Sequence, residues 1–395
     1  MVPAEGRQAG GAGGGARILF IPEEDHASTS DRTSLALRTL RERHEVVGLR
    51  SPWDRIVYDS ARPTWPRALL YIADKAILAA RAVAAMRRHR AQVVFCETAH
   101  HALAGLFAAR LVGARCIWDS HGCGRKLFES LGKGPLRIRF VTRLERFLGG
   151  RVDALITVSE ADATAYVEMG LPASKVHVVP VSVDLREIDR LAGAHPGPSG
   201  GAPDGVPILL LFGSFRYEPN REALEFVNGT LAPHLERLGV RCEIQVAGRD
   251  VPLLAFHRTV RVVGFVPNIY ETIRAAAVCL VPVRRGVGVL TKVIDTMAVG
   301  TPVVLSGFAA EGIPEIRHGV HGLVAETDEA FLRHVVAALS DPASAHGMAL
   351  QARRLVEAKF DWRAYTPFLD AIIRGPGRPA PPGGHHGSRT HHAGR

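Results

Sequence analysis

The sequence is poor in cysteine and aromatic residues and has no long uncharged apolar run, and these shortages exclude several classes of protein. Its five cysteines are scattered and form no CxxC pair. We therefore expect buried, reduced thiols, as is typical of a cytoplasmic protein, and no disulfide scaffold. The most apolar stretch, residues 68–86, contains Asp74, Lys75 and Arg81. We interpret it as a helix and not as a membrane span, which needs about 18 or more apolar residues. Residues 10–15 are Gly/Ala-rich and do not resemble a secretory signal.

The chain is long and carries an excess of positive charge. Its 395 residues suggest more than one domain. Lysine and arginine number 49 against 39 acidic residues, a formal net charge of +10. Part of this excess lies in residues 374–395, which contain no acid. The basic balance favours anionic partners, namely nucleotides, phospholipid surfaces or nucleic acids.

Both halves of the chain alternate short β-branched runs with helical patterns, which predicts parallel sheets covered by helices. We expect strands at residues 17–21, 45–49, 92–96, 115–119, 153–158, 176–180, 208–212, 242–247, 260–263, 278–282 and 302–305. We expect helices at residues 32–43, 66–89, 100–112, 136–148, 160–169, 219–237, 268–276, 290–299, 327–340 and 343–359. The expected fold class is α/β, with two Rossmann-like domains that face each other across a cleft.

A Gly/Pro/Ala-rich segment without periodicity separates the two halves and predicts a linker at residues 191–206. The first domain is then expected at residues 17–190 and the second at residues 207–360, followed by a helix at residues 361–374. Residues 1–16 and the Pro/Gly/His-rich residues 375–395 are predicted to be disordered.

The first candidate for a ligand site is the strand-to-helix junction LLLFGSFRYEPNREALEF at residues 209–226. The strand ends at Gly213, and Pro219 suits the first turn of the following helix. Free backbone N–H groups and the helix dipole at a helix start favour a phosphate. Arg216 and Arg221 could add positive charge. The alternative is an ordinary strand-to-helix turn without a ligand.

A stronger candidate lies at residues 281–313. Gly286 and Gly288 allow the backbone to approach a ligand closely. The next helix carries Lys292 in its first turn and Asp295 on the same face. This helix start therefore offers backbone amides and an ammonium group to a diphosphate and a carboxylate to sugar hydroxyls. Alternatively, the lysine and the aspartate form a surface pair, since the complete Rossmann glycine fingerprint is absent.

These motifs together resemble the GT-B glycosyltransferases of retaining family 4, also called glycosyltransferase group 1, and most closely the bacterial exopolysaccharide-type sugar transferases. The resemblance covers about residues 17–374. In the second half it rests on GSFRYEPNREALEF, GVGVLTKVIDTMAVGTPVV and AAEGI, at residues 213–226, 286–304 and 309–313. In the first half it rests on RILFIPEEDHASTSDR, WDSH, LERF, ALITVSEADA and VVPVSVD, at residues 17–32, 118–121, 144–147, 154–163 and 178–184.

The resemblance implies transfer of a sugar from a nucleotide donor, with retention of the anomeric configuration and without a metal or other cofactor. The donor would lie on the second domain and the acceptor, a glycan, a lipid-linked molecule or a small molecule, on the first. The final helix, at residues 361–374, would cross back between the domains. The resemblance implies catalytic roles for Lys292, Glu311 and His121. It implies donor binding by Gly213, Ser214, Arg216, Asn220, Gly286, Val287, Gly288, Val289 and Asp295, and acceptor binding by Asp31, Arg32 and Asp119.

The sequence departs from the family pattern at several donor positions. Val287 stands where many members have the first of two carboxylates in a Glu-x7-Glu pattern, and Ser214 and Asn220 stand where an Arg/Lys pair is common. Residues 290–291 lack an arginine that the related subgroup often has. The donor site is therefore less cationic than the family pattern, which leaves open weak activity, an unusual donor, or a non-catalytic scaffold.

In the first half, His121 follows a strand and resembles the family's cleft histidine, although a purely structural histidine would fit the same pattern. Cys116, His121 and Cys123 do not supply the four ligands of a structural zinc site. Asp31 and Arg32 lie where the family has a substrate loop, or alternatively cap the helix that follows.

Residues 125–151 combine eight basic residues with apolar residues at helical spacing, among them Leu136, Phe140, Leu144 and Phe147. Such a basic amphipathic helix predicts peripheral contact with an anionic membrane on its cytoplasmic face. The alternative is a core-packed helix with a solvated face.

Two other function classes also remain open. A nucleotide-sugar epimerase shares the arrangement of two facing domains, and would release nucleotide and epimerised sugar without an acceptor. A nucleic-acid binder is suggested by the basic charge alone, because no basic-aromatic stacking motif or zinc finger is present.

Overall fold

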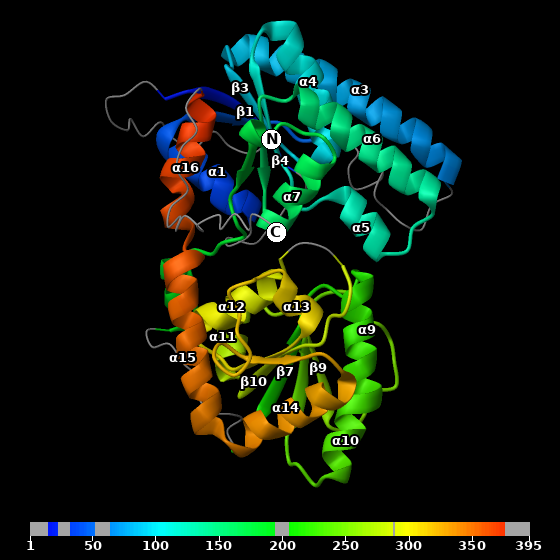
Figure 1. Cartoon of the computed structure of the whole chain (residues 1–395), viewed down its shortest axis with the longest axis vertical. Coiled ribbons are helices and arrows are strands. Elements are labelled where there is room, and N and C mark those ends of the chain that lie inside the picture. The colour runs from blue at the N-terminus through cyan, green and yellow to red at the C-terminus, as the bar shows by residue number, and fades with distance from the viewer. Residues whose placement is uncertain (1–14, 23–31, 52–63, 194–204, 287–288, 376–395) are drawn as a thin grey trace, which may run out of the picture.

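The computed structural model describes residues 15–22, 32–51, 64–193, 205–286 and 289–375. Within these ranges it contains two six-stranded sheets, one in each half of the chain, and every described strand pair is parallel. Figure 1 shows the N-terminal half above the C-terminal half. The expected α/β class with two Rossmann-like units is confirmed.

The sheet of the N-terminal half has the strand order β2-β1-β3-β4-β5-β6. Its strands are β1 (Arg17–Ile21), β2 (Glu45–Gly48), β3 (Val93–Glu97), β4 (Arg115–Asp119), β5 (Ala154–Thr157) and β6 (Val176–Val178). Its helices are α1 (Arg32–Arg43), α3 (Thr64–His89), α4 (Thr98–Val112), α5 (Gly124–Ser130), α6 (Pro135–Arg151), α7 (Glu160–Glu168) and α8 (Leu185–Ala192), with a 3₁₀ turn at Ala173–Lys175.

The sheet of the C-terminal half has the strand order β12-β11-β10-β7-β8-β9. Its strands are β7 (Ile208–Phe212), β8 (Glu243–Ala247), β9 (Val260–Gly264), β10 (Val278–Val281), β11 (Val303–Ser306) and β12 (Leu323–Ala325). The remaining helices are α9 (Glu218–Phe226), α10 (Ala232–Arg237), α11 (Ile269–Ala275), α12 (Thr291–Val299), α13 (Gly307–Glu311), α14 (Asp328–Ser340), α15 (Pro342–Lys359) and α16 (Trp362–Arg374).

Strand β1 shows why its sheet is covered by helices on both faces. Successive side chains of a strand point to opposite faces. Ile18 and Phe20 are buried in a cluster with residues of α1 and α16, whereas Leu19 and Ile21 are buried with residues of α3 and α4. A strand that is apolar on both faces can be stable only between two helical layers.

The helix expected at residues 219–237 is interrupted. Helix α9 passes into a π-helical turn at Val227–Leu231 before α10, and the Ala232 N–H bonds to the Val227 carbonyl five residues earlier. Pro233 follows at the start of α10 and has no N–H to donate to the preceding turn. The wider turn therefore coincides with the residue that breaks the α-helical bond pattern.

Helix α16 belongs to the end of the chain but completes the core of the N-terminal half. In Figure 1, α15 lies along the C-terminal half and α16 continues upward beside the N-terminal half. The crossing is held at Val183, whose N–H donates to the Phe360 carbonyl (2.8 Å) and whose carbonyl accepts from the Trp362 N–H (2.9 Å). Beyond it, Phe368 and Ile372 are buried against β1, β3 and α1.

Among the helices of the described residues, none is long and apolar enough to cross a membrane.

Candidate active site

The carboxyl ends of parallel strands are where open α/β sheets bind ligands, and the C-terminal half places a buried lysine at one such end. Lys292 lies in the first turn of α12 and is 9% exposed. Its Nζ donates to the Phe212 carbonyl at the end of β7 (2.9 Å) and to Oδ1 of Asn220 (2.8 Å). Burial lowers the pKa of this lysine to about 8. Within the described residues the ammonium group makes no ion pair.

Gly213 and Asn220 position this lysine. Gly213 has φ +147°, and a Cβ there would lie 3.0 Å from both Lys292 Nζ and Asn220 Nδ2. The Asn220 amide donates to the Ser214 carbonyl (2.7 Å), which turns its oxygen toward the lysine. The expected donor-binding residues Gly213 and Asn220 therefore hold the lysine, while the side chains of Ser214 and Arg216 lie on the exposed surface.

Asp295 lies one helical turn beyond the lysine and does not pair with it. Its Oδ1 accepts a hydrogen bond from the Tyr270 hydroxyl (3.4 Å). Surrounding protein atoms desolvate the carboxyl group and raise its pKa to about 7, although the residue keeps some exposed surface. The alternative prediction of a lysine–aspartate surface pair is wrong, because the lysine is buried and bonds to β7 and α9 instead.

The glycine-rich loop before α12 contacts the other half of the chain. Gly286 has φ +136°, and a Cβ there would lie 2.4 Å from the Tyr217 hydroxyl, so this position requires glycine. Its N–H donates to Ser130 Oγ on α5 (3.1 Å). Val289 packs against the core of the C-terminal half. Val287 and Gly288, two of the expected donor-binding residues, lie outside the described residues.

This loop is preceded by two arginines that were not among the expected site residues. Both form ion pairs with acidic side chains. Arg285 pairs with Glu218 (3.0 Å) and with Glu222, which raises the pKa of the arginine. Arg284 pairs with Asp328. Acids therefore balance the charges of both arginines, whereas the charge of Lys292 is not balanced by any described acid.

Glu311 is exposed at the last residue of the short helix α13. Its expected role was catalytic. No hydrogen bond or ion pair within the described part of the chain joins it to Lys292 or Asp295. The structure thus brings Gly213, Asn220 and Lys292 together, and leaves Glu311 without a described link to them.

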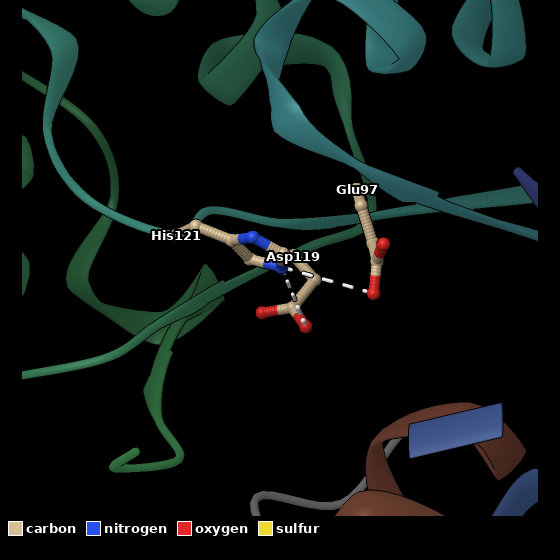
Figure 2. Close-up of side chains that lie close together, drawn as sticks. All are labelled: Glu97, Asp119 and His121. Carbon is tan, nitrogen blue, oxygen red and sulfur yellow. Dashed lines mark ion pairs between the residues drawn. The ribbon is translucent and has the colours of Figure 1, made fainter. Parts of the chain in front are cut away.

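In the N-terminal half, His121 faces two carboxylates at the ends of neighbouring strands. Figure 2 shows Glu97 from β3 and Asp119 from β4 beside one nitrogen of the His121 ring. That nitrogen, Nε2, lies 3.7 Å from Glu97 Oε1 and 4.0 Å from Asp119 Oδ2. Both carboxylates are buried, whereas the histidine side chain is 25% exposed.

The start of α1 holds both carboxylates. Arg32 forms an ion pair with Asp119 (2.8 Å) and donates to the Val179 carbonyl (2.9 Å). Thr33 donates its hydroxyl to Glu97 Oε2 (2.8 Å). The expected acceptor-binding residues Arg32 and Asp119 therefore bind each other, and the third, Asp31, lies outside the described residues.

Glu97, Asp119 and His121 are close enough together to be considered as metal ligands, since one ligand atom of each lies within 4.8 Å of the others. The donor set does not fit a divalent cation, because Arg32 already binds Asp119 and would repel a second positive charge. We therefore assign no metal to these residues.

Glu97 and Thr33 were not among the site residues expected from the sequence. A signal was present for the glutamate, since an acidic residue directly follows the apolar run VVFC and strand ends face the ligand-binding edge of the sheet. No local signal was present for the threonine, because its contact with Glu97 joins residues 64 positions apart.

The two halves of the chain match two glycosyltransferase families. Residues 19–182 match the glycosyl transferase 4-like domain, and residues 206–341 match the glycosyl transferases group 1. The chain is a glycosyltransferase. It has a glycosyl transferase 4-like domain in its first half and a group 1 domain in its second half, and its fold is GT-B. The comparison with curated proteins gave no match.

Solved structures support the fold of this glycosyltransferase. Sucrose-phosphate synthase from Thermosynechococcus elongatus superimposes with a TM-score of 0.70 at 17% identity, covering 91% of this chain and 98% of that one. HepE of Anabaena, solved with UDP, gives a TM-score of 0.61 at 15% identity, covering 89% and 98%. A UDP-forming trehalose-phosphate synthase from Burkholderia xenovorans gives 0.65 at 13% identity, covering 91% and 99%. At these identities the likeness establishes the GT-B fold.

Proposed function

We propose that this glycosyltransferase binds a nucleoside diphosphate sugar at the start of α12 and transfers the sugar to an acceptor held by the N-terminal half. The observation that carries the proposal is Lys292, a buried ammonium group at the end of β7 without a described acidic partner. The N-terminus of α12 adds partial positive charge at the same place. A diphosphate is the ligand that both features favour.

Transfer requires that negative charge be stabilised on the departing phosphate. The bond between the anomeric carbon and the phosphate oxygen breaks, and its electron pair stays with the phosphate. The acceptor hydroxyl oxygen bonds to the anomeric carbon and loses its proton. Lys292 and the amides of the loop that contains Gly286 are proposed to stabilise the phosphate charge, a role in which preorganised donors are effective. These groups would make a bound metal unnecessary.

We further propose that the anomeric configuration is retained. Retention without a covalent intermediate requires the acceptor to attack on the side from which the phosphate departs, so that the phosphate can take the hydroxyl proton. The support for this proposal is the resemblance of residues 286–304 and 309–313 to the retaining family 4 glycosyltransferases. Proton NMR of the product, which distinguishes the two anomers, tests this point.

The first donors to test are UDP-sugars, since the structurally similar HepE has been solved with UDP and with UDP-glucose. We expect wild-type protein to release UDP from a UDP-sugar in the presence of an acceptor mixture, in EDTA as well as in buffer with Mg²⁺. The Lys292→Met variant should lose at least about 100-fold of this rate, as removal of one transition-state donor usually does.

Lys359→Met is the matched control, because Lys359 lies at the end of α15 and outside the site. Equal rates for Lys292→Met and the control, with both proteins folded, would contradict the proposed site. Release of epimerised sugar without any acceptor would favour the epimerase alternative.

We also propose that α6 docks the enzyme on an anionic membrane, where a lipid-linked acceptor would be presented. Leu136 and Phe140 are 77% and 66% exposed on this helix. Nearby arginines on α6 are also exposed and take part in none of the described ion pairs, namely Arg137, Arg139, Arg143 and Arg146. Exposed apolar side chains surrounded by arginine are typical of a helix that lies in the headgroup region.

Co-sedimentation with vesicles tests the membrane proposal. We expect wild-type protein to bind vesicles of phosphatidylglycerol and phosphatidylcholine more than vesicles of phosphatidylcholine alone, and to detach as salt is raised. The Phe140→Ser variant should bind less. Leu253→Ser is the control, since Leu253 is fully exposed in the C-terminal half. Equal binding of the two variants would contradict the assignment to α6.

A further inference from the structure

The least expected feature of the N-terminal half is the burial of Glu97. This side chain is 0% exposed, and it lies at the last residue of β3, opposite Asp119 at the last residue of β4. A fully buried carboxylate is costly unless other groups bind it. The residues that surround the Glu97 carboxylate therefore indicate its role.

The two carboxylates are held differently. Arg32 neutralises Asp119 through an ion pair. Thr33, the next residue of α1, gives Glu97 a hydroxyl hydrogen bond at 2.8 Å, which orients the carboxylate without cancelling its charge. The cationic form of His121 can balance the negative charge of Glu97, because its Nε2 lies 3.7 Å from Oε1, the second oxygen of that carboxylate.

The backbone beside Glu97 is strained. Thr98 follows with φ +62°, in the left-handed region that β-branched residues rarely adopt. Such strain persists only where the surrounding structure enforces it, and it is concentrated at functional sites. Here the strained residue is the first of α4 and directly follows Glu97, the last residue of β3.

We propose that Glu97 is a positioning residue for His121. The negative charge of its carboxylate, 3.7 Å from Nε2, favours the tautomer that carries the proton on Nε2, so that the histidine titrates at Nδ1. The negative charge also favours the imidazolium form, which is the form that donates from both nitrogens. A role of His121 in transfer is what the family resemblance implies and rests on the proposed function, whereas its coupling to Glu97 does not.

Glu97→Gln and Thr33→Val separate charge from structure. Glutamine keeps an oxygen that accepts from Thr33 but removes the negative charge beside Nε2. Valine removes the hydroxyl and keeps the charge. NMR titration of the unliganded protein, with the His121 resonance identified by its loss in His121→Gln, measures the coupling directly and needs no substrate.

We expect the titration midpoint of His121 to fall by about one pH unit in Glu97→Gln, since an opposite charge within about 4–6 Å has an effect of at least this size. Thr33→Val should leave the midpoint near its wild-type value. Asp119 and Arg32 also face the site, and because they are unchanged in both variants they do not produce the difference.

An unchanged midpoint in folded Glu97→Gln would overturn the inference, and so would an equal fall in Thr33→Val. Where transfer is measurable, its rate profile against pH should shift in the same direction as the His121 midpoint. A shifted midpoint with an unshifted rate profile would leave the coupling established and contradict the role in transfer that the family resemblance implies for His121.

Discussion

Lys292 and Asp295 are three residues apart on α12, and burial affects their charges in opposite ways. Desolvation lowers the pKa of the lysine to about 8 and raises that of the aspartate to about 7. Both groups therefore have pKa values close to neutral pH, so a small change in their surroundings changes their protonation. Binding of a charged ligand should change their protonation.

Nucleoside diphosphate binding should depend on pH through the lysine. In the folded protein without ligand, Lys292 loses its proton above about pH 8, whereas the ligand's negative charge favours the protonated form. We expect the affinity for UDP to fall as pH rises from about 8, with proton uptake on binding. Calorimetry in two buffers of different ionisation enthalpy measures this uptake. No difference between the buffers at pH 9 would contradict it.

The pKa of Asp295 is shifted upward, opposite to that of Lys292, and this shift provides a second test. Because the pKa of Asp295 is raised from 3.8 to about 7, the folded protein binds more protons than the unfolded chain between these values, and this group's contribution to stability falls as pH rises through them. We expect Asp295→Asn to raise the melting temperature at pH 8 and to weaken nucleotide binding by about 10-fold, the effect of one lost hydrogen bond to a charged group. Lower thermal stability of the variant at pH 8 would contradict this account of the carboxyl group.

At the scale of elements, α5 is the clearest case of a helix built by tertiary contacts. Glu145 on α6 is 2% exposed and accepts from the backbone N–H of Gly124 (2.8 Å), from that of Arg125 (3.2 Å) and from the hydroxyl of Tyr166 (3.0 Å). It thus binds the first turn of α5, three residues after His121. Burial raises the pKa of the glutamate, which is stable there because these donors surround it.

Replacing this glutamate should loosen α5. We expect Glu145→Ala to destabilise the protein by about 3 kcal/mol, because it removes the acceptor of the part-buried Gly124 and Arg125 N–H groups and one partner of the buried Tyr166 hydroxyl. Glu145→Gln should cost less, since its amide oxygen still accepts. Urea unfolding measures both. Equal stability of the two variants would show that the hydrogen bonds do not hold the helix.

The regular elements were predictable from the sequence, and the short ones were not. Strands β1, β4 and β7 begin and end where their apolar runs predict, because each run is flanked by charged, small or turn-forming residues. Helices α5, α8 and α13 and strand β12 were not expected. Each has eight residues or fewer, too few for periodicity to be decisive. Helix α5 in addition depends on hydrogen bonds to the distant Glu145.

The same distinction applies to the site. The first turn of α12 was predictable, since Lys292 follows a glycine-containing loop after a strand. Its hydrogen bond to the Phe212 carbonyl was not, because that contact spans 80 residues. The pairing of Arg32 with Asp119 spans 87 residues. Sequence alone identified the residues as polar groups near strand ends, and only the fold shows that they bind each other.

At the scale of the whole molecule, the two halves share a helix. The buried residues of α16 pack against β1 and β3 of the other half, and Arg115 donates to the carbonyl of Ile373 at the end of the helix (2.7 Å). Trp362 donates from its indole to Thr39 Oγ1 on α1 (2.6 Å). The N-terminal half therefore depends for its core on the last residues of the fold.

Weakening α16 should affect the N-terminal half first. Phe368 is 6% exposed, and we expect Phe368→Ala to cost about 3–5 kcal/mol. Tryptophan fluorescence is a suitable probe, since Trp118 lies in β4 and Trp362 in α16. Its unfolding midpoint in urea should fall, whereas Leu253→Ala should leave it unchanged. An unchanged midpoint for Phe368→Ala would mean that α16 is not needed by this half.

The measurement that tests the central claim most directly is calorimetric binding of UDP, GDP, ADP and dTDP to wild-type protein, Lys292→Met and Lys359→Met. We expect at least one nucleotide to bind wild type and Lys359→Met equally, and to bind Lys292→Met at least about 10-fold more weakly. Equal binding to all three proteins would place the nucleotide away from the start of α12. No binding of any nucleotide to the wild type would contradict the claim that this helix start is a donor site.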